Sequence, residues 1–401
     1  MPRATNELIF MIDETGPSGI VIGIDASRNR SGGAKAHLIG ILKSFDPRAL
    51  GVSQVHVWSY PKLLAALPDE PWIIKHAPPE LDMSIFRQIW WQLTQLHAHA
   101  KALGCHIMLN TGAGTLSRFK PSVTMSRDML SFEPGEMQRY PLFSKARLRL
   151  FSIKHLQIHA LRKATGVIFL TEYAANALQK FTGYLPFYRI IPHGISESFR
   201  QKPIPGYWAG ERSHIRCVYV SNSDLYKHQW HVIEAISILR RKGHPVTIDL
   251  IGGGQGLGWD MTRAAIAQHD PNGTFVHSIG AVAHEEIPRH LAQADIFVFA
   301  SSCENMPNTL IEGMASSLPI ASSDRGPMRE ILGDAGAYFD PEQPDSIANA
   351  IEQLLTDTAR RQTCTQEASR AAGKYSWKRC SRETFSFLVD VARANLKKSS
   401  S

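Results

Sequence analysis

Two glutamates beside an apolar run have the types and the spacing that best suit chemistry in this chain. Glu304 follows the apolar run 296–300, and Glu312 lies eight residues further on, in a segment (309–315) that suits a helix. In open sheets of alternating strands and helices, ligands bind at the carboxyl ends of the strands. Both carboxylates can therefore face one crevice. A helix-entry glutamate followed by a solvated one explains the spacing equally well.

Two further segments have the features of a phosphate site. Helix starts present unpaired N–H groups to anions, and a helix beginning after Pro307 would offer such groups. The residues concerned are Asn308, Thr309 and Leu310. Gly32 and Gly33 follow another apolar run, 19–25, and adjacent glycines let a backbone approach a phosphate closely. Taken alone, the glycine pair also fits a plain turn.

Short apolar runs alternate with longer segments of helical period along most of the chain. The first series lies at 19–25, 55–59, 72–75, 106–110, 123–125, 167–171 and 188–192, and the second at 216–221, 246–252, 274–277, 296–300, 319–322 and 337–339. Segments such as 85–103 and 231–242 have the helical period. This alternation predicts parallel sheets covered by helices on both faces. Two series predict an α/β protein with two doubly wound domains.

The break between the two series has the composition of a linker. Prolines and glycines interrupt any regular pattern between residues 197 and 213. We predict a first domain over 1–196, a linker over 197–213 and a second domain over 214–375. A last helix, 376–398, is expected to pack back across the first domain.

The glutamate pair belongs to a longer pattern. Glu304, seven intervening residues and Glu312, followed by Gly313-Met-Ala315 and Leu318-Pro-Ile320, resemble the signature of retaining glycosyltransferases of family 4. These nucleotide-sugar enzymes have the GT-B fold, two facing Rossmann-like domains with a deep interdomain cleft. Other segments that resemble the family are Ile191-Pro-His-Gly-Ile195, Tyr219-Val-Ser-Asn-Ser-Asp-Leu-Tyr-Lys-His228, Asp249-Leu-Ile-Gly-Gly-Gly254, Gly280-Ala-Val-Ala-His284, Gly326-Pro-Met-Arg-Glu330 and Ala335-Gly-Ala337.

The resemblance implies roles for particular residues. Glu312 would bind the ribose of the donor nucleotide, Glu304 would lie by the transferred sugar, and Lys227 would neutralise the leaving diphosphate. Other groups implied on the donor side are the amides of Asn308, Thr309 and Leu310, and residues Gly32, Gly33, Gly253 and Val282. The acceptor side would include His37, one turn into the helix after the glycine pair.

The chain departs from the family pattern at two places. Asn222 stands where the family often has an arginine five residues before Lys227. The stretch 124–129, where the family often has a catalytic histidine, has none, and Arg127 or Asp128 occupies that place. In retaining members the leaving diphosphate itself is thought to accept the acceptor's proton, so the missing histidine is compatible with transfer.

Composition and charge narrow the class of protein. Aromatic residues make up 9% of the 401 and charged residues 20%, which is typical of a packed protein rather than a disordered one. The five cysteines are scattered, so we expect reduced thiols and no metal site. No apolar run approaches the roughly 20 residues that span a bilayer, and residues 1–17 lack the order of a signal peptide. We therefore expect a cytoplasmic protein.

The excess positive charge lies in the first half of the chain. Residues 1–200 carry 23 basic and 14 acidic side chains (+9), whereas residues 201–401 carry 21 and 22 (−1). The segment 137–171 has seven basic side chains and no acidic one. A basic amphipathic helix there fits peripheral contact with an anionic inner leaflet, and it fits a solvated helix face equally well. Nucleic acid is not an expected partner, because no binding motif accompanies the charge.

The expected function is transfer of a sugar from a UDP- or GDP-sugar to a hydroxyl of a glycan or lipid-linked acceptor, with retention, in bacterial surface polysaccharide biosynthesis. The nucleotide sugar is then a substrate, and no tightly bound cofactor or metal is expected. A nucleotide-sugar 2-epimerase of the same fold and a non-catalytic glycan- or nucleotide-binding relative are the alternatives.

Overall fold

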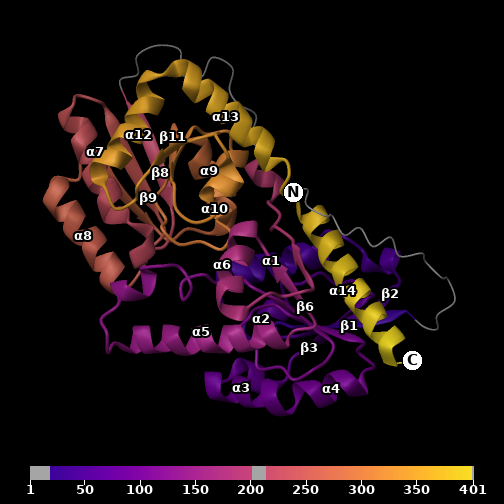
Figure 1. The fold of residues 1–401 in the computed structure, drawn as a ribbon. Helices are drawn as coiled ribbons and strands as arrows, with labels where there is room; N and C mark the ends of the chain where they lie inside the picture. The colour runs from indigo at the N-terminus through magenta and orange to yellow at the C-terminus, as the bar shows by residue number, and fades with distance from the viewer. Residues whose placement is uncertain (1–18, 201–213, 400–401) are drawn as a thin grey trace.

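The computed structural model describes residues 19–200 and 214–399, which contain two parallel sheets. The first has the strand order β3-β2-β1-β4-β5-β6-β7 and the second the order β10-β9-β8-β11-β12-β13. Every strand pair is parallel. In Figure 1 the two sheets and their helices form two bodies, one above the other. The predicted α/β class with two doubly wound domains is confirmed.

The strands lie where the apolar runs predict them, within a few residues. Those of the first sheet are β1 (Ile20–Asp25), β2 (Val52–Trp58), β3 (Ile73–His76), β4 (Ile107–Asn110), β5 (Ser122–Met125), β6 (Gly166–Phe169) and β7 (Tyr188–Ile190). Those of the second are β8 (Ile215–Val220), β9 (Val246–Ile251), β10 (Val276–Gly280), β11 (Ile296–Phe299), β12 (Ile320–Ser323) and β13 (Ala337–Phe339). The central strands β4, β5, β6, β9, β11 and β12 are buried along their whole length, as expected for parallel sheets covered on both faces.

Helices cover both sheets. Those between the strands of the first sheet are α1 (Gly32–Lys43), α2 (Pro61–Leu64), α3 (Ile85–Thr94), α4 (Leu96–Ala102), α5 (Lys145–Lys163) and α6 (Glu172–Thr182). The second sheet has α7 (Gln229–Arg241), α8 (Leu257–His269), α9 (Ile287–Ala292), α10 (Asn308–Ala315), α11 (Met328–Leu332), α12 (Pro344–Thr356) and α13 (Thr358–Ala372). Short 3-10 helices include η1 (Pro47–Leu50), η2 (Pro79–Asp82), η3 (Glu136–Arg139), η4 (Glu197–Phe199), η5 (Leu225–Lys227) and η6 (His284–Glu286).

The helical segment predicted over 85–103 is two helices rather than one. A break at Gln95 separates α3 from α4. Trp91 and Leu96 both face the same core cluster. A separation of five residues does not bring two side chains to one face of a continuous helix, so the interruption lets both of them reach the core.

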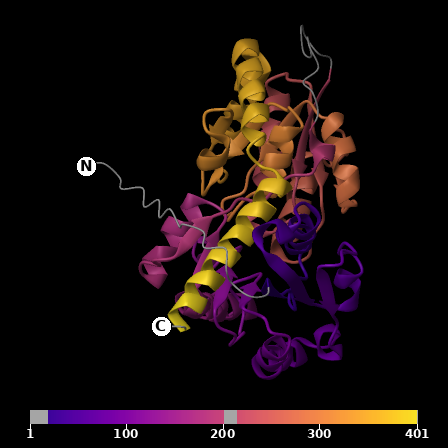
Figure 2. The same cartoon turned by 90° about the vertical axis from the view of Figure 1, so that its right-hand side faces the viewer.

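The last helix, α14 (Trp377–Ser399), lies along the first body although it follows the second in sequence (Figures 1 and 2). It packs against α1 and η1 and reaches β1 and β4. Phe385 and Phe387 of α14 are fully buried. The chain thus returns to the first sheet after completing the second.

The two chain crossings between the bodies touch each other. Ile195, on the way out, forms a parallel bridge with Ser376, on the way back. Gly194 lies so close to Trp377 that an added Cβ would be 2.1 Å from its backbone nitrogen. The predicted linker 197–213 begins with η4, and its residues 201–213 lie outside the described residues. The domain boundaries therefore stay a prediction.

We predict that Gly194→Ala destabilises the protein, because the new methyl group meets backbone that cannot move aside as a side chain could. Overpacking of this kind costs about 1–3 kcal/mol, so Tm should fall by roughly 2 °C or more in a thermal unfolding experiment. Gly114→Ala is the control, since its nearest atom, Nη1 of Arg28, is 3.9 Å away. Equal melting temperatures for the two variants would contradict the close approach.

Candidate functional site

The strand orders determine where a ligand can bind. In each sheet the order reverses at the centre, between β1 and β4 in the first and between β8 and β11 in the second. Loops that leave these neighbouring strands diverge to opposite faces and open a crevice at the carboxyl edge of the sheet. Lys227 lies in the connection after β8, and Glu304 lies in the connection after β11. The reversal point of the second sheet therefore supplies both predicted catalytic residues.

Lys227 and Glu304 form an ion pair. Nζ of Lys227 donates to Oε1 of Glu304, and the two side chains are only 10% and 15% exposed. The lysine backbone is also fixed, because the hydroxyl of Tyr219 donates to its carbonyl oxygen over 2.7 Å. The next residue, His228, has φ 48°, which is rare for a residue with a side chain. The turn after β8 thus directs Lys227 toward Glu304, which the connection after β11 supplies.

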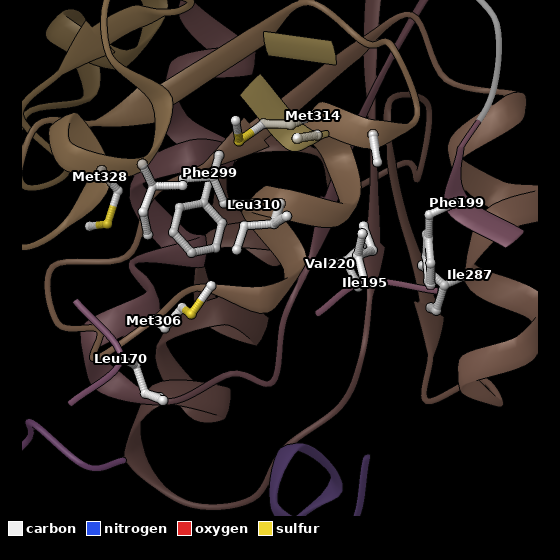
Figure 3. Packing of buried hydrophobic residues seen from close by; sticks show 14 of the residues in the cluster. Leu170, Ile195, Phe199, Val220, Ile287, Phe299, Met306, Leu310, Met314 and Met328 are labelled. Carbon is white, nitrogen blue, oxygen red and sulfur yellow. The ribbon is translucent and has the colours of Figure 1, made fainter. Parts of the chain in front are cut away.

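Backbone amides at the start of α10 lie four residues beyond Glu304. Pro307 precedes the helix and caps it with no side-chain hydrogen bond. The amide of Leu310 donates to the Pro307 carbonyl over 3.1 Å, so this predicted phosphate donor is already used. The amides of Asn308 and Thr309 are the ones a helix start leaves free for an anion. In Figure 3 the side chains of Leu170, Met306 and Leu310 follow one another through the core below α10.

Glu312 lies on the second turn of α10 and is almost fully buried. Its Oε1 accepts a hydrogen bond from Nε2 of His284 at 2.8 Å. The hydrogen bond to Glu312 holds the pKa of His284 above its usual 6.5, and this outweighs the opposite effect of burial. His284 begins η6, two residues after Val282. The loop that contains Val282 thus provides the partner of the proposed ribose-binding carboxylate.

The glycine turn after β9 supports the loop that presents Lys227. The carbonyl of Gly253 accepts from the amide of Ser223 at 3.2 Å. At Gly252, φ is +125° and an added Cβ would lie 2.1 Å from the Ser221 carbonyl oxygen. Both contacts hold the backbone just before Lys227, so Gly253 supports the connection after β8 through its backbone carbonyl.

The predicted phosphate loop of the first domain faces α10 of the second. Gly32 and Gly33 begin α1, and Ser31 caps the helix by accepting from the Ala34 amide. A Cβ built on Gly33 would lie 3.8 Å from Nδ2 of Asn308. The structure therefore brings Gly33 and Asn308 together across the domain interface, although 275 positions separate them in the numbering.

His37 is in the expected helix but does not face an open cleft. It is fully buried, its ring lies 4.6 Å from that of His193 and 6.0 Å from that of Trp377, and α14 covers it. Burial lowers the pKa of His37 well below 6.5. His37 is thus enclosed in this structure, and its role on the acceptor side stays a prediction.

The structure separates the two candidates of the stretch 124–129. Arg127 is partly buried and donates through Nη2 to Oδ1 of Asn29 at 3.2 Å. Burial lowers its pKa to about 10, which leaves it charged at neutral pH. Asp128 accepts instead from the Leu130 amide (3.0 Å) and from Gln157 on α5 (3.3 Å), so it stabilises a local turn. Of the two residues, only Arg127 lies among buried polar side chains such as Asn29.

Polar atoms without a partner gather at the domain interface. Among the described residues, buried side-chain atoms with no hydrogen bond include both ring nitrogens of His193, both amide atoms of Asn305, Oδ1 of Asn308, Nη1 of Arg127 and Nδ1 of His37. Burial and the charge of Arg127 lower the pKa of His193 to about 3, so its ring is neutral. Buried polar groups normally have partners. This concentration marks a place where hydroxyls or oxyanions of a ligand would be accommodated.

Direct hydrogen bonds join the two domains around these unpaired polar groups. Thr171 donates to the Asn305 carbonyl at 2.9 Å, and Ser302 donates to Oε1 of Glu136 at 2.6 Å. Glu330 accepts from the first two amides of α6 at 2.9 and 2.8 Å, which caps the helix from the other domain. A cavity of about 440 Å³ lies beside these contacts, lined by residues of both domains that include Glu136, Arg139, Ser302 and Arg325.

Asn222 stands at the position where the family often has an arginine. Asn222 donates to Asp224 and is exposed. In the parts of the chain that the structure describes, no group of three or more His, Cys, Asp or Glu side chains could hold a metal ion. The five cysteines are buried and free. The candidate donor site consists of Lys227, the start of α10 and two glutamates.

Sequence reasoning missed the roles of His193, His284 and Asn29 in this arrangement. His193 and His284 both stand in segments that resemble the family, and their histidine identity was the available signal. Asn29 lies in an unremarkable turn before the glycine pair. Nothing in its spacing indicates that its Oδ1 would accept from both Arg127 and the hydroxyl of Thr111.

Comparison with known proteins identifies the second domain. Residues 213–371 match the family model of glycosyl transferases group 1. The chain is 31% identical over 110 residues to O-antigen chain mannosyltransferase B of Escherichia coli, a match over 27% of this chain and 29% of that protein. It is 24% identical over 234 residues to the alpha-D-kanosaminyltransferase of Streptomyces kanamyceticus, over 56% and 60% of the two chains. The chain thus covers less than two thirds of these relatives.

Solved structures confirm the fold over almost the whole chain. The sucrose-phosphate synthase of Thermosynechococcus elongatus superimposes with a TM-score of 0.72 at 16% identity, covering 94% of this chain and 100% of that one. The Anabaena protein HepE, solved with UDP-glucose, gives a TM-score of 0.66 at 19% identity over 92% and 99%. The expected GT-B fold and the family resemblance are both confirmed: the chain has a GT-B fold, and its residues 213–371 match the model of glycosyl transferases group 1.

Proposed function

We propose that the protein transfers a sugar from a UDP- or GDP-sugar to a hydroxyl group of a glycan or lipid-linked acceptor, with retention at the anomeric carbon. The observation that carries this proposal is the convergence of groups at the domain interface. Lys227, Glu304 and the first amides of α10 lie on one side, and the Gly33 loop approaches them from the other. A cation, helix amides and carboxylates in one crevice suit a ligand that carries both phosphates and hydroxyls.

The proposed chemistry uses few protein groups. The bond between the anomeric carbon and the diphosphate oxygen breaks, and the acceptor oxygen bonds to that carbon on the same face. The diphosphate takes the acceptor's proton, so no side-chain base is needed. Charge grows on the diphosphate during this step, and a lysine and helix amides placed there stabilise it. Glu304 would exchange its contact with Lys227 for hydroxyls of the transferred sugar.

The proposed acceptor is a growing bacterial surface polysaccharide or a lipid-linked precursor at the cytoplasmic face of the inner membrane. Two observations support it: the basic character of the first half of the chain and the name of the E. coli relative, an O-antigen mannosyltransferase. None of the helices that the structure describes has the length and apolar composition to cross a bilayer. The proposed site needs no metal, and the donor is a substrate rather than a bound cofactor.

Nucleotide diphosphates test the donor site directly. UDP or GDP should raise Tm, because a ligand at 100 times its Kd stabilises the folded state by about 2.7 kcal/mol. Glu312→Ala should remove most of this shift, since a hydrogen bond to a charged group contributes about 1.5–3 kcal/mol. Glu352→Ala is the control, because this glutamate pairs with Lys242 on the surface. Stabilisation of the wild type by neither nucleotide would contradict the proposed function.

Lys227→Ala should lower kcat of sugar transfer by about 10²–10³, as removal of one preorganised electrostatic group does in other enzymes. The measurement is release of UDP or GDP from the nucleotide sugar that the thermal shifts select. Lys242→Ala, which removes a surface lysine at the end of α7, should leave kcat unchanged. Transfer at the wild-type rate by Lys227→Ala would overturn the assignment, and epimerised nucleotide sugar without acceptor would favour the 2-epimerase.

Donor affinity should depend on pH through His284. Its pKa is raised by Glu312, so the pair is strongest at low pH and weakens as pH rises through that raised value. Ribose hydroxyls compete with His284 for the carboxylate, so the Kd for the nucleotide should decrease as pH rises through the raised pKa of His284. His284→Ala should bind more tightly at pH 6 and lose this part of the pH dependence in calorimetric titrations. Parallel pH profiles for wild type and variant would disprove the competition.

A further inference from the structure

The helix α5 presents apolar side chains to solvent next to basic ones. Phe143 is 96% exposed, Leu148 67% and Phe151 54%. Leu142, just before the helix, is also exposed, as are Lys145 and Arg149. We call these six residues the outer face of α5: Leu142, Phe143, Lys145, Leu148, Arg149 and Phe151. In Figure 1 the helix runs along the lower body as a long horizontal element.

These exposed apolar side chains are not part of the hydrophobic core. Leu150, Gln157 and Leu161 are the residues of α5 that face inward and are buried. At about 100° per residue, Leu148 and Phe151 point away from that side. The sequence shows one apolar set in this helix, and the tertiary structure divides it into a buried row and an exposed row. Exposed apolar groups gathered on one face mark an interaction site.

Beyond the outer face, α5 packs against the end of α6. Nζ of Lys154 lies 3.9 Å from the ring centre of Phe181, and Arg162 donates to the Thr182 carbonyl at 2.8 Å. These contacts hold the end of α6 against α5. Tyr184, two residues beyond α6, is 79% exposed. An exposed aromatic side chain therefore also lies near the end of α6.

The sequence that forms the outer face and α5 carries charge of one sign. The segment 137–171 contains no acidic residue, and Arg162 and Lys163 at the end of α5 are exposed. The exposed apolar residues of α3 provide the contrast. Phe86 is 80% exposed, but the preceding turn carries Glu80 and Asp82. Apolar exposure occurs on both helices, whereas uniform positive charge accompanies only α5.

We infer that the outer face of α5 docks on an anionic lipid bilayer. Leucine and phenylalanine side chains enter the boundary between headgroups and acyl chains, and the lysines and arginines meet lipid phosphates. A second copy of the chain fits less well, because a symmetric contact would bring the two sets of positive charges together. Nucleic acid would satisfy the charges but would leave the exposed aliphatic groups of Leu142 and Leu148 without a partner.

The location of the outer face determines from which side a lipid-linked acceptor would reach the crevice, and this step rests on the proposed function. Arg139 lies three residues before Leu142 and donates to Glu342 of the second domain at 2.6 Å. The segment that enters the bilayer is therefore continuous with the domain interface. A lipid-linked acceptor held at the headgroup level would reach the crevice from this side.

Vesicle co-sedimentation of the full chain tests the inference without donor or acceptor. Vesicles of phosphatidylcholine with phosphatidylglycerol should bind the protein, and binding should fall in high salt. Each basic group removed should weaken binding about fivefold, which corresponds to about 1 kcal/mol, so Lys145→Gln with Arg149→Gln should lose about 25-fold. Phe143→Ser with Phe151→Ser should also lose binding, and unchanged Tm would show that these variants fold. Phe86→Ser is the matched control and should bind like wild type.

Several results would overturn the inference. Equal binding to vesicles of pure phosphatidylcholine, or wild-type binding by both double variants, would remove the membrane role. Loss of vesicle binding by Phe86→Ser would show that α3, and not α5, carries the membrane-binding surface. If sedimentation equilibrium showed a dimer, and Phe143→Ser with Phe151→Ser dissociated it, the outer face would be a contact between two copies of the chain. If the protein retarded duplex DNA in a gel, and Lys145→Gln with Arg149→Gln abolished this, the outer face would be a nucleic-acid surface. Because no sugar transfer is measured, the outcome is independent of the nucleotide tests.

Discussion

Buried polar groups must find partners, and this constraint governs the middle of the molecule. The two parallel sheets meet there through their loop-bearing edges, where polar groups lie beside apolar ones such as Leu170 and Met306. Thr171 with Asn305 and Ser302 with Glu136 satisfy part of the interface directly. His193, Asn305 and Asn308 have buried polar atoms that stay unpaired among the described residues. A ligand rich in hydroxyls and oxyanions would supply those partners and favour the closed arrangement.

A few charged groups are proposed to bind the donor, whereas many basic groups are proposed to act together on the acceptor side. The second half of the chain has a net charge of −1, yet it holds the groups proposed to meet a diphosphate. One lysine and helix amides in a poorly hydrated place can do this, because nearby charges interact strongly where water is scarce. The first half spreads its excess charge along α5, where the interaction with a surface adds over many groups.

The chain path explains how two such domains act together. The bridge between Ile195 and Ser376 ties the outgoing crossing to the returning one, and α14 anchors the end of the chain on the first sheet. His37 and His193 are packed beside this junction, under Trp377. The junction is therefore a packed element of the structure, and the residues beside it include groups that the sequence resemblance would place near substrates.

The sequence by itself determined the strands, the doubly wound sheets and the donor-side motif, because each depends on local patterns. Apolar runs bounded by turns predict buried strands, and Glu304 and Glu312 are separated by a short loop and one helix turn. Only the tertiary structure decided which groups meet. In the tertiary structure Glu312 accepts a hydrogen bond from His284, and the Leu310 amide donates to the Pro307 carbonyl. His37 is buried under α14. Arg127, and not Asp128, donates to Asn29 near the domain interface. The tertiary structure also divided the apolar residues of α5 between core and solvent. The physical reason is that burial and pairing depend on contacts between residues far apart in the chain, which no local spacing records.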